Sequence, residues 1–264
     1  MLGAIIGDIV GSRFEFNNTN SLDIELFTPA CSFTDDTICT VAIADAVMNG
    51  NKDYGKKLHE WCNKYRNPMG GYGGSFARWV ASDNPQPYNS LGNGSAMRVA
   101  SIGWLFDTLE EVRGEAEKTA LPTHNHPEEI KGAVATAEAI FLARNYGKKE
   151  MLAAMTLYYP QWVEPMLGQK RFNETCRGTM PVVFGIINKA TSYEEAIRYA
   201  IAVGGDSDTI GAIVGSIAEA IWEILDYIKV KVLEYLPKEM IAILKQTPNQ
   251  KILRFMLRIV NRNS

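Results

Sequence analysis

The stretch Gly204-Gly205-Asp206-Ser207-Asp208-Thr209 directly precedes a segment in which apolar residues recur every three or four positions. This spacing predicts a helix with one buried face, formed by Ile210, Ile213, Val214, Ile217, Ile221, Leu225 and Ile228. Oxygen-bearing side chains at a helix start can cap the helix, because they accept hydrogen bonds from its free N–H groups and because carboxylates suit its dipole. They can also hold a cation. On this stretch alone, capping by Asp206 or Ser207 is the favoured interpretation.

A second acidic stretch, Thr34-Asp35-Asp36-Thr37, begins another apolar segment, whose inner side carries Ile38, Val41, Ala42, Ala44 and Val47. Adjacent carboxylates repel each other, and a helix cap needs only one of them. The surplus oxygen ligands suit Mg²⁺, Mn²⁺ or Ca²⁺, whereas zinc would favour interleaved histidine or cysteine, and neither stretch has any. Four carboxylates in two such stretches predict a two-metal site, with ions about 3.5–4 Å apart.

The length and composition allow a sizeable core, since 46% of the 264 residues are hydrophobic. On a prior of ~150 residues per domain the chain could form one or two domains. Because the two acidic stretches lie at opposite ends, a shared site requires one compact domain, which we expect over residues 1–264. The net charge of −3 lacks the basic excess of a nucleic-acid-binding protein, so no nucleic-acid partner is expected.

The four cysteines, Cys31, Cys39, Cys62 and Cys176, form no C-x-x-C pair and indicate reduced thiols in a cytoplasmic protein. The N-terminus has no basic region and Asp8 interrupts its apolar start, so no signal peptide is expected. The run from Thr209 to Ala218 is shorter than the ~20 residues of a membrane span, and no membrane partner is expected.

The remaining pattern predicts an all-α fold. Gly3, Gly7 and Gly11 recur every four residues on one face of an N-terminal helix, which predicts close packing against another helix. Further helices are expected over 53–66, 96–106, from Pro127 onward, 148–158, 174–190, from Ser192 to the glycine pair, and at the basic, amphipathic C-terminal segment 251–262. No segment has a convincing strand pattern.

Two small-residue turns could approach a ligand with their backbones. The segment 67–75 has glycines at 70, 71, 73 and 74, and exposed N–H groups there could hold a phosphate. It lacks the Lys-Ser/Thr ending of a P-loop and follows no strand, so it is no mononucleotide motif, and a flexible loop is the alternative. The second turn is Ser90–Ser95, in which Asn93 could simply hold a left-handed turn.

Two histidines, His124 and His126, precede Pro127 at another helix start. We discount a metal-binding interpretation, because histidines at helix starts more often cap the helix or contact solvent. His126 is expected to be structural.

Five blocks of this sequence, taken in order, resemble the ADP-ribosylglycohydrolase family, which includes the dinitrogenase-reductase-activating glycohydrolases. Each block alone is weak evidence, but all five in the family's order are specific, and they extend from residue 3 to about residue 222. The blocks are Gly7–Glu15, Phe33–Thr37, Gly92–Arg98, Thr123-His124 and Gly204–Thr209.

The resemblance implies a single orthogonal multi-helix domain that hydrolyses an ADP-ribosyl bond at the ribose anomeric carbon with two Mg²⁺ or Mn²⁺ ions. By residue-for-residue match, the metal ligands would be Thr34, Asp35, Asp36, Asp206, Asp208 and Thr209. Glu15 would be the catalytic glutamate, and Asp36 is the second candidate for proton transfer.

The resemblance also implies a substrate-binding set. Gly71, Tyr72 and Gly73 would line the pyrophosphate, Ser90, Leu91, Gly92 and Asn93 would contact the phosphates, sugar and adenine, and His124 would lie near the substrate. Leu91 stands where some members carry an aromatic residue, so stacking on adenine would fall to Tyr72, Phe76 or Tyr88.

The substrate expected from the bacterial branch is ADP-ribosyl-arginine on a protein or a small conjugate, with free ADP-ribose as product. An O-linked serine conjugate or small-molecule ester is the alternative leaving group. A non-catalytic ADP-ribose-binding module would lose carboxylates from the metal set, and none is missing here. A prenyl-diphosphate enzyme would show D-D-x-x-D, where this chain has Thr34-Asp35-Asp36-Thr37.

Overall fold

Two helices from opposite ends of the sequence, α1 (Leu2–Gly11) and α12 (Ser207–Ile221), pack against each other in the centre of the molecule. In the computed structural model, a Cβ atom added at Gly7 would lie 1.9 Å from the carbonyl oxygen of Gly211, and one at Gly3 would lie 2.2 Å from that of Gly215. The helices are antiparallel, and their backbones touch where side chains are absent. The predicted packing of the N-terminal glycines is confirmed.

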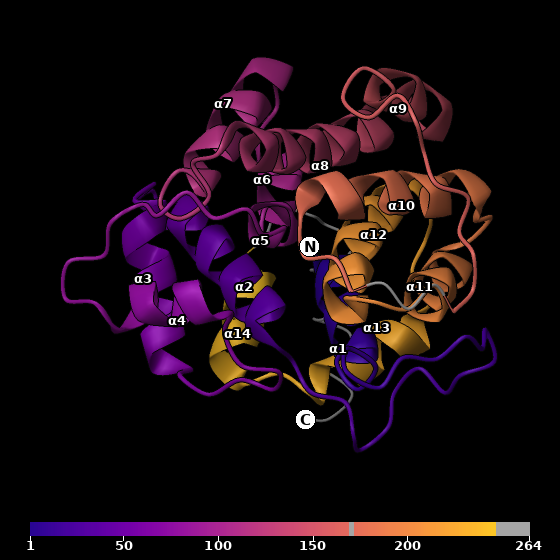
Figure 1. Ribbon diagram of the computed structural model, residues 1–264, viewed down its shortest axis with the longest axis horizontal. Coiled ribbons are helices and arrows are strands. Elements are labelled where there is room, and N and C mark those ends of the chain that lie inside the picture. Colours follow the sequence, from indigo (N-terminus) through magenta and orange to yellow (C-terminus); the bar gives the residue numbers. More distant parts are fainter. Residues whose placement is uncertain (169–171, 247–264) are drawn as a thin grey trace.

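The structure describes residues 1–168 and 172–246, within which all regular elements are helices (Figure 1). The all-α prediction is confirmed, and the predicted helix at 251–262 lies outside the described residues. The other helices are α2 (Asp35–Met48), α3 (Tyr54–Lys64), α4 (Gly74–Ala81), α5 (Gly94–Met97), α6 (Ala100–Leu105), α7 (Leu109–Ala120), α8 (Pro127–Tyr146), α9 (Lys148–Met155), α10 (Cys176–Lys189), α11 (Tyr193–Ala202), α13 (Asp226–Leu233) and α14 (Lys238–Lys245).

The start of α2 is attached to α1 through one buried carboxylate, that of Asp8. It accepts hydrogen bonds from the backbone N–H of Thr34 (3.0 Å) and of Thr37 (3.1 Å), and from the hydroxyl groups of both threonines. At the same end of α1, a Cβ atom at Gly11 would lie 2.5 Å from Cα of Asp208. The fold therefore brings the acidic starts of α2 and α12 together, although they are far apart in the sequence.

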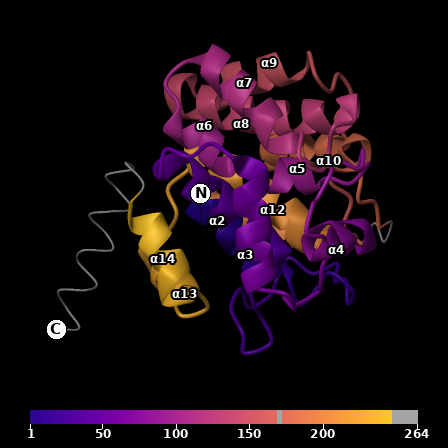
Figure 2. The same ribbon diagram turned by 90° about the vertical axis from the view of Figure 1, so that its left-hand side faces the viewer.

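The outer helices surround this centre. The long helix α8 contacts α5, α6 and α12, and α7 and α9 lie outside it (Figure 1). Helices α13 and α14 lie on the side of the molecule opposite to α4 and α10 (Figure 2). No helix within the described ranges is both long and apolar enough to cross a membrane. All four cysteines are free and buried.

Two predicted helices are broken. The segment expected to continue to residue 228 ends at Ile221, where Trp222 is extended, and Ile228 belongs to α13. The apolar spacing persists across this break because Ile228 packs into the same core. The segment 96–106 forms two short helices, α5 and α6, separated at Arg98 and Val99. Helices α4 and α7 were not predicted.

Candidate functional site

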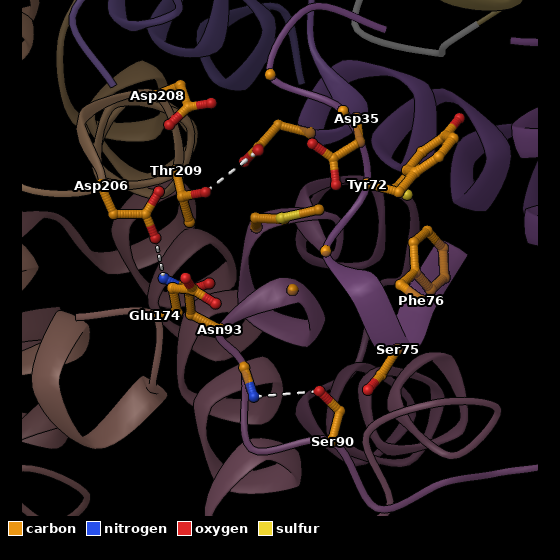
Figure 3. Close-up of a pocket in the computed structure, with 18 of the residues that line it drawn as sticks. Asp35, Tyr72, Ser75, Phe76, Ser90, Asn93, Glu174, Asp206, Asp208 and Thr209 are labelled. Atoms are coloured by element: carbon orange, nitrogen blue, oxygen red, sulfur yellow. Dashed lines mark hydrogen bonds between the residues drawn. The ribbon is translucent and has the colours of Figure 1, made fainter. Parts of the chain in front are cut away.

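A cavity of about 380 Å³ opens where the starts of α2 and α12 meet. Asp206, Asp208 and Thr209 lie at one end of it, Ser75 and Ser90 lie at the other, and the rings of Tyr72 and Phe76 line one side between them (Figure 3). The volume is within the ~300–1,000 Å³ typical of small-molecule sites. One end of the cavity is thus rich in carboxylates, and the other is built from small-residue turns.

The carboxylates form two groups that share Asp208. Within each group, one oxygen atom from each of the three carboxylates lies within 4.8 Å of the other two. One group is Asp8, Asp36 and Asp208, and the other is Glu15, Asp206 and Asp208. In the described part of the chain, Oδ1 of Asp36 and Oδ1 of Asp208 are buried and have no hydrogen-bond partner. Buried carboxylate oxygens without donors are costly, and a hard divalent cation satisfies them. The donor set therefore fits Mg²⁺ or Mn²⁺.

Capping does not account for the carboxylate of Asp206. It occupies the N-cap position of α12, but its side chain accepts no capping hydrogen bond from the backbone N–H groups of that helix. Oδ2 of Asp206 instead accepts a hydrogen bond from Nδ2 of Asn93 (2.8 Å). At α2, by contrast, Thr34 is the cap, since its hydroxyl accepts a hydrogen bond from the N–H of Asp36. The interpretation of Asp206 as a cap is wrong, and its carboxylate faces the cavity (Figure 3).

Two of the three threonines in the acidic stretches, Thr34 and Thr209, join the helix starts to their neighbours. The hydroxyl of Thr34 donates to Oδ1 of Asp8 (2.7 Å), and Thr34 does not line the cavity. The hydroxyl of Thr209, which lines the cavity, donates to Oδ2 of Asp36 (3.2 Å). Thr209 thereby links α12 to α2 across the acidic end.

The sequence analysis assigned no role to the side chain of Asp8, although this residue lies in the first block of the family resemblance and interrupts an apolar segment. Both oxygens of this carboxylate accept hydrogen bonds from Thr34 or Thr37, so Asp8 organises the start of α2 rather than facing the cavity. The signal was present, because a carboxylate within a fully apolar, glycine-spaced helix needs buried donors.

Burial and mutual repulsion shift the acidic groups strongly. Desolvation, followed by neighbouring carboxylates, raises the pKa of Asp35, of Asp36 and of Asp208 well above the usual range. Burial, followed by the charge of Asp206, raises the pKa of Glu15 to about 7. A divalent cation would reverse these shifts, because it favours the charged form of each carboxylate.

Glu15 lies against the first glycine-rich turn. A Cβ atom at Gly70 would lie 2.6 Å from Oε2 of Glu15, and Gly70 has a φ of +78°. Only glycine combines this left-handed backbone with this close approach. Gly70 therefore lies directly against the carboxylate to which the family resemblance assigns catalysis.

The cavity wall brings together most of the predicted site residues. Asp35, Asp36, Asp206, Asp208, Thr209, Glu15, Gly71, Tyr72, Gly73, Ser90, Gly92, Asn93 and His124 all line it. Thr34 and Leu91 do not line it, and the side chain of Leu91 is 54% exposed. Three aromatic residues were considered for stacking on adenine. The rings of Tyr72 and Phe76 contact each other edge to face, with their centroids 5.4 Å apart, and Tyr88 also lines the wall.

Several lining residues were missed. Phe16 and Phe172 are exposed and stack with ring centroids 6.2 Å apart, and Glu174 lies near Asn93 and Asp206 (Figure 3). Phe16 follows Glu15 directly, which was the available signal. Phe172 and Glu174 lie in the loop before α10, and nothing in their local sequence indicated a site.

The two histidines have different environments. His126 caps α8 by accepting a hydrogen bond from the N–H of Glu128 (3.2 Å), which confirms its structural role. His124 is buried in the cavity wall, where burial and the charge of Arg98 lower its pKa well below the usual range. His124 is therefore neutral.

The amino-acid sequence of this chain is similar to those of known ADP-ribosylhydrolases. ADP-ribosylhydrolase ARH3 of Mus musculus is 29% identical over 175 residues, which are 54% of this chain and 47% of that protein. The human protein matches equally, at 29% identity over 54% of this chain and 48% of its own length. The chain thus spans about half the length of these curated relatives. An ADP-ribosylarginine hydrolase of Pseudomonas putida is 24% identical over 84% of this chain and 69% of its own.

A solved structure described as an ADP-ribosylglycohydrolase-related protein complex has the same fold. It aligns with a TM-score of 0.71 and 23% identity over 93% of this chain and 94% of its own. The model of the ADP-ribosylglycohydrolase family matches residues 1–247. The chain therefore belongs to the ADP-ribosylglycohydrolase family.

Proposed function

We propose that this protein hydrolyses the glycosidic bond between ADP-ribose and its target, with two divalent cations held at the acidic end of the cavity. The observation that carries this proposal is the overlap of two carboxylate groups at Asp208, with unpartnered oxygens on Asp36 and Asp208. This surplus of buried negative charge opens into a cavity whose other end consists of small-residue turns.

The ligands for Mg²⁺ or Mn²⁺ would be Asp35, Asp36, Asp206 and Asp208, together with the hydroxyl oxygens of Thr34 and Thr209. When bound, the cations would orient the sugar hydroxyls and stabilise the charge that develops as the glycosidic bond breaks. Asn93 fixes Asp206 through its 2.8 Å hydrogen bond, and Thr209 fixes Asp36. These bonds hold two of the four carboxylates in place before any ligand arrives.

Glu15 is the candidate for proton transfer. A water molecule would add to the anomeric carbon of the ribose while the bond from that carbon to the leaving atom breaks. Glu15 would take the proton of this water and return it to the leaving group. Its position supports this role, because a carboxylate oxygen of Glu15 lies within 4.8 Å of those of Asp206 and Asp208, beside the proposed ions. Asp36 is the second candidate, although the fully buried Asp36 is also a proposed metal ligand.

The rest of the cavity would bind the ADP part of the substrate. Gly73 would offer its backbone N–H group to the diphosphate. Gly71, whose N–H donates to the carbonyl oxygen of Pro68 (3.1 Å), would line the diphosphate without donating to it. The Ser90–Asn93 turn is held by the hydrogen bond from the N–H of Gly92 to the hydroxyl of Ser90 (3.2 Å). Tyr72, Phe76 and Tyr88 supply the aromatic faces available for adenine.

The mouth of the cavity favours arginine as the leaving group. The exposed aromatic pair Phe16 and Phe172 stands there with the carboxylates of Glu15 and Glu174. A guanidinium group stacks on aromatic rings and pairs with carboxylates. The similarity to an ADP-ribosylarginine hydrolase supports the same choice. An O-linked serine conjugate would use neither feature fully.

The domain organisation, the cellular location and the partners are proposed from the same structure. A continuous core, whose described residues extend from Met1 to Leu244, supports the proposal of a single domain over residues 1–264. The free, buried cysteines support a reducing, cytoplasmic location. The partners would be an ADP-ribosylated protein or a small ADP-ribose conjugate, with ADP-ribose as the product.

A panel of defined conjugates tests this proposal. The protein is incubated with ADP-ribosyl-arginine and ADP-ribosyl-serine peptides that differ only at the modified residue, with Mg²⁺, with Mn²⁺ or with EDTA, and free ADP-ribose is measured. We expect metal-dependent release that is faster from arginine. Faster release from serine would reverse the choice of leaving group. Tight binding of ADP-ribose without release from any conjugate would instead identify a binding module.

A further inference from the structure

The cavity wall contains one buried guanidinium group, that of Arg98, which is only 1% exposed. Its Nη2 atom donates to the carbonyl oxygen of Thr119 (2.7 Å) and to the hydroxyl oxygen of Thr123 (2.9 Å). Within the described ranges it forms no salt bridge with a carboxylate, and its Nε atom has no hydrogen-bond partner. A buried charge without a counter-ion is costly, so its position requires an explanation.

The hydrogen bond from Arg98 to Thr123 determines which group donates in the hydrogen bond between Thr123 and His124. The hydroxyl of Thr123 lies 2.7 Å from Nδ1 of His124, and its oxygen already accepts a hydrogen bond from Arg98. Among the residues that the structure describes, this hydroxyl has no other partner. If Nδ1 carried a proton, the hydroxyl hydrogen of Thr123 would be a buried donor with no acceptor. The hydroxyl therefore donates to Nδ1, and the proton of the neutral ring is on Nε2.

Nε2 of His124 faces the second small-residue turn. A Cβ atom at Gly94 would lie 3.0 Å from Nε2, and one at Gly92 would lie 3.6 Å from it, so the absence of side chains there leaves this nitrogen accessible from the cavity. The side chain is nineteen-twentieths buried (5% exposed), and no described residue accepts a hydrogen bond from Nε2. This donor therefore requires an acceptor on the ligand.

We propose that Arg98 and Thr123 are positioning residues, which hold His124 in the tautomer with its proton on Nε2 so that it donates a hydrogen bond to the diphosphate of the substrate. Arg98 is the only lysine or arginine among the described lining residues. Its charge stands behind His124 and has no protein counter-ion. An anionic oxygen of the ligand would accept the hydrogen bond from Nε2 of His124 and would also balance the charge of Arg98.

This arrangement also restricts the chemistry of His124. Because Nδ1 is occupied by Thr123 and Nε2 carries the proton, the face of the ring toward the cavity cannot accept a proton. His124 therefore binds substrate and takes no part in proton transfer. That the ligand is a diphosphate depends on the proposed function, whereas the tautomer is a property of the protein alone.

The tautomer is measured by ¹H–¹⁵N NMR of protein with ¹⁵N-labelled histidine, without ligand. The chain has three histidines, so His59→Gln and His126→Gln variants assign the signals. We expect an unprotonated Nδ1 and a protonated Nε2 on His124. A protonated Nδ1 in the wild-type protein would overturn the proposal. This measurement requires no turnover, so its result is independent of whether the protein is a hydrolase.

The second measurement is calorimetric binding of ADP-ribose, pyrophosphate and adenosine. Thr123→Val keeps the shape of the side chain but removes the hydroxyl, and the matched control Thr123→Ser keeps it. We expect Thr123→Val to mix the tautomers and to weaken the binding of ADP-ribose and of pyrophosphate by about twofold to fivefold, because the affinity falls in proportion to the fraction of protein in the donating tautomer. The binding of adenosine should not change. Thr123→Ser should retain the wild-type tautomer and affinities. Equal weakening of all three ligands, or none, would contradict a role at the diphosphate.

Discussion

The side-chain amide of Asn93 donates a hydrogen bond to Oδ2 of Asp206 across 2.8 Å, although the two residues are 113 positions apart in the sequence. Asn93 belongs to the small-residue turn at one end of the cavity, and Asp206 belongs to the acidic end. Nδ2 of Asn93 also donates to the hydroxyl of Thr179 on α10 (3.0 Å). One amide therefore fixes the relative positions of the proposed phosphate-binding and metal-binding parts.

The metal assignment predicts loss of binding when a shared carboxylate is neutralised. Asp208→Asn should weaken Mn²⁺ binding more than Asp35→Asn, because Asp208 belongs to both carboxylate groups and Asp35 to neither. Isothermal calorimetry measures both, and Asp107→Asn is the control, since that side chain is 98% exposed. Two ions bound by Asp208→Asn with wild-type affinity would refute the assignment.

Replacing Glu15 separates a catalytic role from a structural one. Glu15→Gln keeps the size of the side chain but removes the base, so we expect turnover to fall by roughly 10²–10⁴-fold, the usual contribution of general acid–base catalysis. The free energy of unfolding should change by no more than about 0.5 kcal/mol, and ADP-ribose binding should persist. Turnover is measured at saturating metal and substrate. A rate above about a third of wild type would transfer the role to Asp36.

For replacement of Asp8 we expect the opposite result, a loss of folding stability rather than a direct loss of catalysis. An amide in Asp8→Asn retains one acceptor oxygen but places an NH₂ group against donors from Thr34 or Thr37. Each hydrogen bond to a charged group is worth roughly 1.5–3 kcal/mol, so urea denaturation should show a loss of at least that size. Asp36→Asn is the comparison, because its carboxylate is repelled by its neighbours, and it should destabilise the metal-free protein less. Equal losses would be inconsistent with a structural role specific to Asp8.

The raised pKa values predict how stability depends on pH. Burial raises the pKa of Asp8 from 3.8 to about 6 and that of Glu15 from 4.5 to about 7. A carboxyl with a raised pKa in the folded state stabilises the fold while protonated, and this contribution is lost as the pH rises through the folded-state pKa. The melting temperature of the metal-free protein should therefore fall between about pH 4.5 and pH 7.5, and Mn²⁺ should restore it. A metal-free melting temperature that rises over this range would contradict the pKa shifts.

The aromatic mouth predicts selectivity between leaving groups. Phe16→Ala removes half of the stacked pair that it forms with Phe172. We expect kcat/KM for ADP-ribosyl-arginine peptides to fall by about threefold to tenfold, as for a cation–π contact of ~0.5–1.5 kcal/mol, with little change for serine peptides. Leu157→Ala, an exposed residue that does not line the cavity, is the control. An equal fall for both conjugates would exclude Phe16 from leaving-group recognition.

The centre of the fold was predictable because its signals are local and physically specific. Glycines four apart on a helix indicate backbone contact, and Gly7 indeed meets Gly211. The surplus of carboxylates at Asp35-Asp36 and at Asp206 predicted that the two helix starts would share a site, and they lie at one end of one cavity.

Other features depend on tertiary contacts that the local pattern does not contain. The apolar spacing continued past Ile221, so it did not indicate that α12 ends there. The absence of a side-chain cap at Asp206 depends on Asn93, which lies in a remote turn. Likewise, Glu174 reaches the cavity only because α10 packs against α8 and α12.

The central claim is that the carboxylates around Asp208 hold the ions that hydrolysis requires. The most direct test measures ADP-ribose release from an ADP-ribosyl-arginine peptide while Mn²⁺ is added back to EDTA-treated protein, with ion occupancy determined in the same samples. We expect no release from the metal-free protein, a rate that rises in step with occupancy, and no release by Asp208→Asn at Mn²⁺ concentrations that saturate the wild type. Full turnover by the metal-free protein, or wild-type turnover by Asp208→Asn, would contradict the claim.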